Sequence, residues 1–205
     1  LSLENQRIRE RLERANRELE NHLKELRDDQ AAGHQVQLNM LPASPWASGE
    51  YRFEHRLIPS LYLSGDFVDY FRVSDSQLAF YLADVSGHGS SSAFVTVLGK
   101  HVTMLGGVID EQQQTLTYSI GGHLPLPVIF ADGEASYLQG RGRPVGLFED
   151  AEYQDEVIDL PAQFSLALCS DGVLDCLEGT TLKEKEARLP QLFAESGGAL
   201  RGLMA

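Results

Sequence analysis

LAFYLADVSGHG, from Leu78 to Gly89, is the stretch around which we expect the rest of the chain to be organised. Its first six residues are apolar and predict a short buried strand. Asp84 follows where the apolar run stops, and the glycines after it allow a sharp turn before a helix that we expect to begin near Ser91. An aspartate at this place either ligates a metal ion or hydrogen-bonds the amides of a local turn, and this stretch alone fits both roles.

Two further stretches place an aspartate beside a glycine, one where a hydrophobic segment begins and one after an apolar run. Asp66 lies in SGDFVDYF (64–71), and Asp171 follows the apolar run in FSLALCSDG (164–172). Carboxylates on neighbouring strand ends repel one another unless a cation lies between them. Oxygen ligands without a His or Cys cluster favour Mg²⁺ or Mn²⁺ over Zn²⁺. Asp66, Asp84 and Asp171 together therefore predict a site for one of these two ions.

Five short motifs follow one another between residues 35 and 176: GDFVDY (65–70), ADVSGHG (83–89), GGHLPLP (121–127), GRPVG (142–146) and SDG (170–172). In this order they resemble the PPM-type metal-dependent Ser/Thr protein phosphatases, and most closely the bacterial SpoIIE-like branch. Members of that branch lie C-terminal to response-regulator or sensor domains and work in partner-switching control of sigma factors. Each motif is weak alone, whereas five in one order over a single domain are specific.

The resemblance implies a fold and an activity. The fold would be an α-β-β-α sandwich, with two antiparallel sheets flanked by helices, and the many short strands of the chain fit this α+β class. The activity would be hydrolysis of a phosphoserine or phosphothreonine on a partner protein, expected to be an anti-sigma-factor antagonist. The resemblance also implies two Mn²⁺ or Mg²⁺ ions, held by Asp66, Asp84, Asp171 and the backbone carbonyl of Val85. No nucleophilic Cys or Ser is then needed, because two-metal hydrolysis uses an activated water.

Three other residues in these motifs have open roles. Asp69 either orients a water molecule at the ions or caps a turn. His88 is expected beside the site and not as its general acid, because its spacing from Asp84 differs from that of the catalytic histidine in some relatives. His123 is either a ligand or acid, or a residue that shapes the edge of a sheet, and the usual role of its motif favours the second.

Residues 1–32 form a different kind of sequence. Seam positions recur at alternating spacings of four and three, at Leu1, Asn5, Ile8, Leu12, Ala15, Leu19, His22 and Leu26. This heptad pattern predicts a coiled-coil helix that makes the protein a homodimer. We expect the helix to connect an upstream receiver or sensor domain to the phosphatase domain at 33–205, with Gly33 as its weak point. The alternative is a single amphipathic helix that lies on its own domain.

Composition excludes some partners. Thirty acidic against 17 basic residues give a net charge of −13, which argues against nucleic-acid binding. No apolar run approaches the roughly 20 residues of a membrane helix, and no signal peptide is present. Cys169 and Cys176 stand in apolar surroundings and predict buried free thiols in a reducing cytoplasm. Because the chain starts at Leu1 within a helical pattern, we expect it to belong to a longer protein.

The chain departs from the family pattern at two places. The helical excursion that family members carry between the helix expected at 91–102 and the strand expected at 104–110 is missing near Thr103 and Met104. The family's last metal-binding aspartate has no counterpart after Asp175. Either the protein diverges from the family at both places or the sequence omits these stretches, and we expect the omission. Two alternatives remain beside a phosphoprotein phosphatase: a phosphatase-fold scaffold that acts as a dimerising adaptor, or a phosphohydrolase of small molecules.

The other elements are short strands joined by turns. We expect strands at 51–58, 62–67, 69–73, 78–83, 104–110, 115–120, 128–130, 136–138, 153–160 and 164–169. Asp132-Gly133 predicts a hairpin turn, and residues 182–192 predict a helix interrupted by Pro190.

Overall fold

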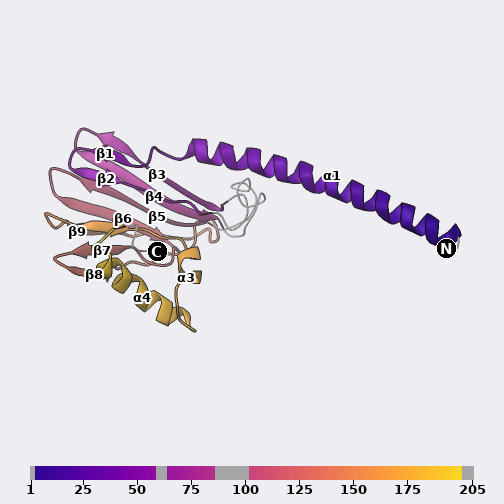
Figure 1. The fold of residues 1–205 in the computed structure, drawn as a ribbon. Helices are drawn as coiled ribbons and strands as arrows, with labels where there is room; N and C mark the ends of the chain where they lie inside the picture. Colours follow the sequence, from indigo (N-terminus) through magenta and orange to yellow (C-terminus); the bar gives the residue numbers. More distant parts are fainter. Residues whose placement is uncertain (1–2, 59–63, 86–101, 200–205) are drawn as a thin grey trace.

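The computed structural model describes residues 3–58, 64–85 and 102–199 and shows a mixed α+β domain with a long N-terminal helix (Figure 1). Its helices in these ranges are α1 (Leu3–Met40), α3 (Gly172–Asp175) and α4 (Leu182–Glu195). Its strands in these ranges are β1 (Trp46–Ser48), β2 (Tyr51–Phe53), β3 (Asp66–Ser74), β4 (Gln77–Val85), β5 (Val102–Asp110), β6 (Thr115–Gly121), β7 (Val128–Ala131), β8 (Glu134–Tyr137), β9 (Asp155–Asp159) and β10 (Ser165–Ala167).

The strands form two main antiparallel sheets, as predicted. The larger sheet has the order β3-β4-β5-β6-β9 and the smaller the order β10-β7-β8, while β1 and β2 pair separately. The turn between β7 and β8 has φ values of 54° at Asp132 and 85° at Gly133. Two successive positive φ values are typical of a type I′ hairpin turn, whose twist matches that of the strands, so the predicted hairpin is confirmed.

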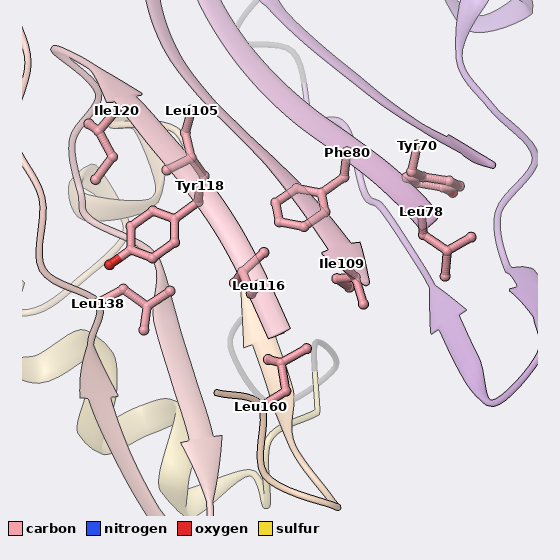
Figure 2. Close-up of a cluster of buried hydrophobic side chains, with 10 residues drawn as sticks. All are labelled: Tyr70, Leu78, Phe80, Leu105, Ile109, Leu116, Tyr118, Ile120, Leu138 and Leu160. Carbon is pink, nitrogen blue, oxygen red and sulfur yellow. The ribbon is translucent and has the colours of Figure 1, made fainter. Parts of the chain in front are cut away.

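The apolar core lies between the two sheets. Figure 2 shows ten of its side chains: Tyr70, Leu78, Phe80, Leu105, Ile109, Leu116, Tyr118, Ile120, Leu138 and Leu160. On β4, the buried residues Leu78, Phe80 and Leu82 alternate with half-buried ones, because successive side chains of a strand point to opposite faces. Ile129 of β7 and Leu166 of β10 pack against the same cluster, which joins the smaller sheet to the larger one.

Helix α4 covers the other face of the smaller sheet (Figure 1). Its buried residues Leu189 and Phe193 form a second apolar cluster with Val128 of β7. The helix begins with a capping box, in which the Thr181 side chain accepts from the Glu184 N–H and the Glu184 side chain accepts from the Thr181 N–H. The two antiparallel sheets and this helical layer confirm the predicted fold class.

Helix α4 continues through Pro190, so the predicted interruption there is wrong. A proline has no N–H to donate to the carbonyl four residues earlier, which here belongs to Glu186. The hydroxyl of Tyr137 on β8 donates to that carbonyl at 2.6 Å. A tertiary contact thus replaces the missing helical hydrogen bond, and a sequence pattern does not reveal it.

Helix α1 is continuous over 38 residues and passes through Gly33 without a break. At 1.5 Å per residue it is about 57 Å long, and it extends away from the sheets (Figure 1). Its strongest seam residues, Ile8, Leu12, Leu19 and Leu26, are between 51% and 64% exposed. The alternative of a helix lying on its own domain is therefore wrong. In the described residues, no helix has both the length and the apolar composition needed to cross a bilayer.

Two expected elements differ from the structure, and a third lies largely outside the described residues. The strand expected at 51–58 is reduced to β2, and residues 54–58 have no regular structure. Strand β5 begins at Val102, so Thr103 and Met104 lie inside a strand and not at a junction. Residues 86–101, which include His88 and most of the expected helix at 91–102, lie outside the described ranges.

Candidate metal centre

Asp66 and Asp84 form a cross-strand pair at one end of the larger sheet. The antiparallel register of β3 and β4 places Asp66 directly opposite Asp84. Val68, two residues after Asp66, packs against the core cluster, and Leu82, two residues before Asp84, is buried. Because side chains two residues apart share a face, both carboxylates lie on the inward face, where the apolar core ends.

Thr103 and His123 continue this polar row across β5 towards β6. Thr103 is opposite Asp84, and its hydroxyl lies 3.4 Å from Nδ1 of His123. Nε2 of His123 lies 2.9 Å from the carbonyl of Cys169. Burial lowers the pKa of His123, so the ring is neutral at pH 7. Since a carbonyl can only accept, Nε2 carries the proton and Nδ1 accepts from Thr103. Both ring nitrogens are engaged within the protein, which favours the structural role of His123.

The segment after β10 contributes the third aspartate. Ser170 donates from Oγ to Oδ2 of Asp66 at 2.7 Å. Asp171 is the N-cap residue of α3, yet its side chain makes no capping hydrogen bond, so its carboxylate is not used by the helix. The Cys169 carbonyl accepts from His123 and the Ser170 hydroxyl donates to Asp66, so both residues before Asp171 are held in place. All three predicted aspartates are therefore grouped at this end of the sandwich.

The three carboxylates act on one another electrostatically. Burial raises the pKa of Asp84 to about 6, and the charges of Asp66 and Asp171 add to the rise. Burial also raises the pKa of Asp66, with the Ser170 hydrogen bond opposing the rise and the charge of Asp171 adding to it. Raised pKa values mean that the ionised forms are unfavourable in this environment. A bound cation would offset that cost, so the donor chemistry of the site fits a hard divalent ion.

The carboxylates do not form a complete set of ligands by themselves. Among the described residues, no three His, Cys, Asp or Glu side chains converge closely enough to hold a metal ion. Mg²⁺ usually keeps several water molecules and binds the protein through one or two carboxylates. The pair Asp66–Asp84 meets this requirement, whereas a structural Zn²⁺ site needs four protein ligands.

Asp69 faces away from the pair. It stands three residues after Asp66 on β3, and the register with β4 is regular over this stretch. Side chains an odd number of residues apart lie on opposite faces of a strand. Oδ1 of Asp69 accepts from the backbone N–H of Tyr70 at 2.8 Å, so the local hydrogen-bonding role is favoured over the water-orienting one.

Val85, the predicted backbone ligand, is the buried last residue of β4. Its N–H donates to the carbonyl of Gly65 at 3.3 Å, so its backbone lies beside the residue that precedes Asp66. His88, which was expected beside the site, lies outside the described residues.

The two cysteines are free but differ in their surroundings. Burial raises the pKa of the Cys169 thiol to about 11, which makes it an unreactive structural residue. Cys176 is exposed, so the prediction of a buried thiol is wrong at this position.

Several residues of the site were not predicted from the sequence. Ser170 was part of the SDG motif, and a hydroxyl among predicted ligand aspartates is a candidate hydrogen-bond donor, but its actual acceptor, Asp66, lies 104 residues away. Thr103 and Gln37 have no local signal, because their partners lie 20 and 27 residues away. Gln37 contacts Ser64, whose hydroxyl accepts from the N–H of Asp66 at 3.1 Å.

Comparison with known proteins identifies relatives of the chain. The family model described as Stage II sporulation protein E (SpoIIE) matches residues 96–204, a span that includes His123 and Asp171. The phosphoserine phosphatase RsbP of Bacillus subtilis (strain 168) is 25% identical over 176 residues, which cover 68% of this chain and 43% of RsbP. The chain thus spans less than half the length of that relative.

Solved structures share the fold. The SiaA-PP2C domain of Pseudomonas aeruginosa has a TM-score of 0.65 at 15% identity, and the match covers 87% of this chain and 84% of that one. The RsbU and RsbW domains of Rv1364c from Mycobacterium tuberculosis give a TM-score of 0.55 at 23% identity, covering 66% of this chain and 46% of that one. These structural matches support the two-sheet phosphatase fold, and the family model spans more than half of the sequence. The chain therefore belongs to the SpoIIE family.

Proposed function

We propose that the protein is a metal-dependent phosphatase that hydrolyses a phosphoserine or phosphothreonine on a partner protein. The observation that carries this proposal is the cross-strand pair of Asp66 and Asp84, with Asp171 within electrostatic reach of both. Neither member of the pair forms a salt bridge with a described residue. An inward-facing pair of like charges without a protein cation is typical of a site that binds a cation.

The residues of the site would either hold the metal ions or orient the groups that hold them. Two Mn²⁺ or Mg²⁺ ions would neutralise the phosphoryl oxygens and lower the pKa of the attacking water. Asp66, Asp84, Asp171 and the carbonyl of Val85 would hold them. Ser170 keeps the Asp66 carboxylate in one orientation. Because such groups are oriented before the substrate binds, they need little rearrangement during the reaction.

The substrate is proposed from homology. RsbP carries the name phosphoserine phosphatase, and the SpoIIE-like branch suggests a phosphorylated anti-sigma-factor antagonist. The net charge of −13 fits a protein partner better than a nucleic acid.

Helix α1 has a separate part in the proposal. Its exposed seam residues would pair with those of a second copy and connect the dimer to an upstream receiver or sensor domain. The free thiols of Cys169 and Cys176 fit a reducing cytoplasm as the location.

Phosphate release measured at increasing Mn²⁺ concentration tests the proposal. The substrates are p-nitrophenyl phosphate and a serine-phosphorylated anti-sigma-factor antagonist from the same organism. The parent protein is expected to release phosphate from the phosphoprotein only with Mn²⁺ or Mg²⁺, and Asp84→Asn is expected to abolish the release. Asp75→Asn removes the same charge in the exposed β3–β4 turn and serves as the matched control. Near-parental turnover by Asp84→Asn with Mn²⁺ present would show that the metal assignment is wrong.

A second candidate function is a phosphatase-fold scaffold that binds a phosphoprotein without turning it over. The incomplete set of ligands among the described residues favours it. Binding of the phosphoprotein without phosphate release at saturating Mn²⁺ would support this adaptor role, and Mn²⁺-dependent release excludes it. Equal turnover of nucleotides or sugar phosphates would instead indicate a small-molecule phosphohydrolase.

A further inference from the structure

Gln37, near the C-terminal end of α1, joins this helix to the residue that leads into β3. Its Nε2 donates to the carbonyl of Ser64 at 2.8 Å, and its Oε1 accepts from the N–H of Ser64 at 3.1 Å. One side chain thus satisfies both backbone groups of a residue that is only 8% exposed. Buried backbone groups outside a sheet ladder need such a partner.

The orientation of Gln37 is unusual for the end of an amphipathic helix. Its neighbours Val36, Leu38 and Met40 are 58%, 40% and 63% exposed, whereas Gln37 is partly buried. Apolar burial alone would turn these side chains inward and the amide outward. The hydrogen bonds to Ser64, and not apolar packing, therefore set the orientation of this helix end.

Ser64 passes this constraint on to Asp66. Its Oγ accepts from the N–H of Asp66 at 3.1 Å. The carbonyl of Gly65, which lies between them, accepts from the N–H of Val85 at 3.3 Å. On the other side, Ser170 donates to the Asp66 carboxylate. Asp66 is thus held through its backbone from the side of α1 and through its side chain from the segment after β10.

A second contact links the exit of α1 to the same strand. The hydroxyl of Tyr70 on β3 donates to the carbonyl of Ala43 at 2.7 Å. Tyr70 also stacks on Trp46 at 5.7 Å between ring centroids. Two points on the chain around the end of α1 are therefore tied to this strand: Ala43 to β3 itself and Gln37 to Ser64, two residues before it.

We propose that Gln37 is a positioning residue of the metal centre. It holds Ser64 and, through Ser64, keeps the first residue of β3 in the orientation that ligates the ion. This inference rests on the proposed metal-dependent function.

The matched pair Gln37→Met and Gln35→Met tests the proposal. Methionine keeps the length and approximate volume of glutamine and removes both hydrogen bonds. Gln35 is exposed on the same helix and donates to Asn39 of α1, away from Ser64. Isothermal titration calorimetry on the full chain without substrate measures the Kd for Mn²⁺. We expect Gln37→Met to weaken Mn²⁺ binding about tenfold, the size typical of residues that orient metal ligands, and Gln35→Met to leave it unchanged.

The thermal unfolding midpoint of the metal-free chain separates a positioning role from a merely structural one. If Gln37→Met lowers this midpoint but leaves the Mn²⁺ affinity of the folded protein unchanged, the role of Gln37 is merely structural and the proposal is overturned. Equal weakening of Mn²⁺ binding by both methionine variants also overturns it, because the effect would then belong to α1 as a whole.

Ser64→Ala keeps the proposal testable if Gln37→Met does not fold. This variant removes the Oγ that accepts from Asp66 and retains the backbone groups that Gln37 contacts. Unchanged Mn²⁺ affinity in Ser64→Ala overturns the proposal. In the double variant Gln37→Met, Ser64→Ala, the two losses of Mn²⁺ affinity are expected to be less than additive, because both substitutions act on one chain of hydrogen bonds.

The same titrations distinguish this inference from the proposed function. A parent chain that binds neither Mn²⁺ nor Mg²⁺ overturns both. A parent chain that binds Mn²⁺, and loses binding with Asp84→Asn but not with Gln37→Met, keeps the proposed function and overturns only the role of Gln37.

Discussion

Asp66 and Asp84 face each other directly across β3 and β4, at the point where the inward rows of core side chains end. Like charges opposite each other on an antiparallel pair destabilise a sheet. The pair lies on the same inward face as Tyr70 and Phe80, which are 5% and 6% exposed. The fold therefore keeps two carboxylates at a place where apolar residues would stabilise it more, which is typical of a functional site.

Asp84→Asn should stabilise the metal-free protein while it removes metal binding. The substitution ends the repulsion with Asp66, and we expect the free energy of unfolding without metal to rise by about 0.2–1 kcal/mol. Urea denaturation with and without Mn²⁺ measures both effects. The parent should gain stability with Mn²⁺ and the variant should not. A metal-free variant less stable than the parent would contradict this prediction.

The seam of α1 should form a parallel dimer. Leu12→Asp combined with Leu19→Asp places two charges in the apolar seam and should convert the dimer to a monomer in sedimentation at tens of micromolar (about the range expected for such a seam). Gln6→Asp combined with Asn21→Asp adds the same charge off the seam and should remain dimeric. A parent that sediments as a monomer at this concentration rules the dimer out.

Tyr137→Phe should destabilise the packing of α4 on β8. It leaves the carbonyl of Glu186 without its donor, at a cost of about 1–3 kcal/mol. Pro190→Ala restores a backbone N–H that can reach this carbonyl, so the cost of Tyr137→Phe should be smaller in that background. Urea denaturation of the four proteins measures the coupling, and Tyr153→Phe, at an exposed tyrosine, is the control. An equal cost in both backgrounds would refute the compensation.

Gly142→Ala should destabilise the fold strongly. A Cβ at this position would lie 1.8 Å from the backbone oxygen of Ile120, and a rigid strand cannot move far enough to relieve this clash. We expect a loss of about 3 kcal/mol, at the upper end of overpacking. Gly172→Ala, where nothing lies within 4 Å of the added Cβ, should have little effect on stability. The midpoint of thermal unfolding checks both, and a Gly142→Ala protein as stable as the parent would be inconsistent with the close approach.

Local patterns predicted the elements whose signals are short-range. The apolar run at 78–83 and the Asp132-Gly133 turn needed only neighbours in the sequence, and the strand β4 and the hairpin that they predict are both confirmed. The prediction of a strand over 51–58 is wrong because the backbone of His55 does not pair with a strand. Its N–H donates to the Ser44 hydroxyl, and the same hydroxyl donates to the His55 carbonyl. The predicted helix break at Pro190 is wrong because the hydroxyl of Tyr137 on β8 replaces the hydrogen bond to the Glu186 carbonyl that proline cannot make.

The sequence by itself determined that Asp66, Asp84 and Asp171 stand beside glycines or turns at the ends of apolar segments and that a heptad seam precedes them, because both are features of residues close together in the sequence. Only the tertiary structure decided which carboxylates meet. The register of β3 and β4 pairs Asp66 with Asp84 and turns Asp69 to the other face. Likewise Ser170 reaches Asp66 from 104 residues away, and Gln37 reaches Ser64 from 27 residues away. Such contacts depend on strand register and on the packing of distant segments, which no local pattern encodes.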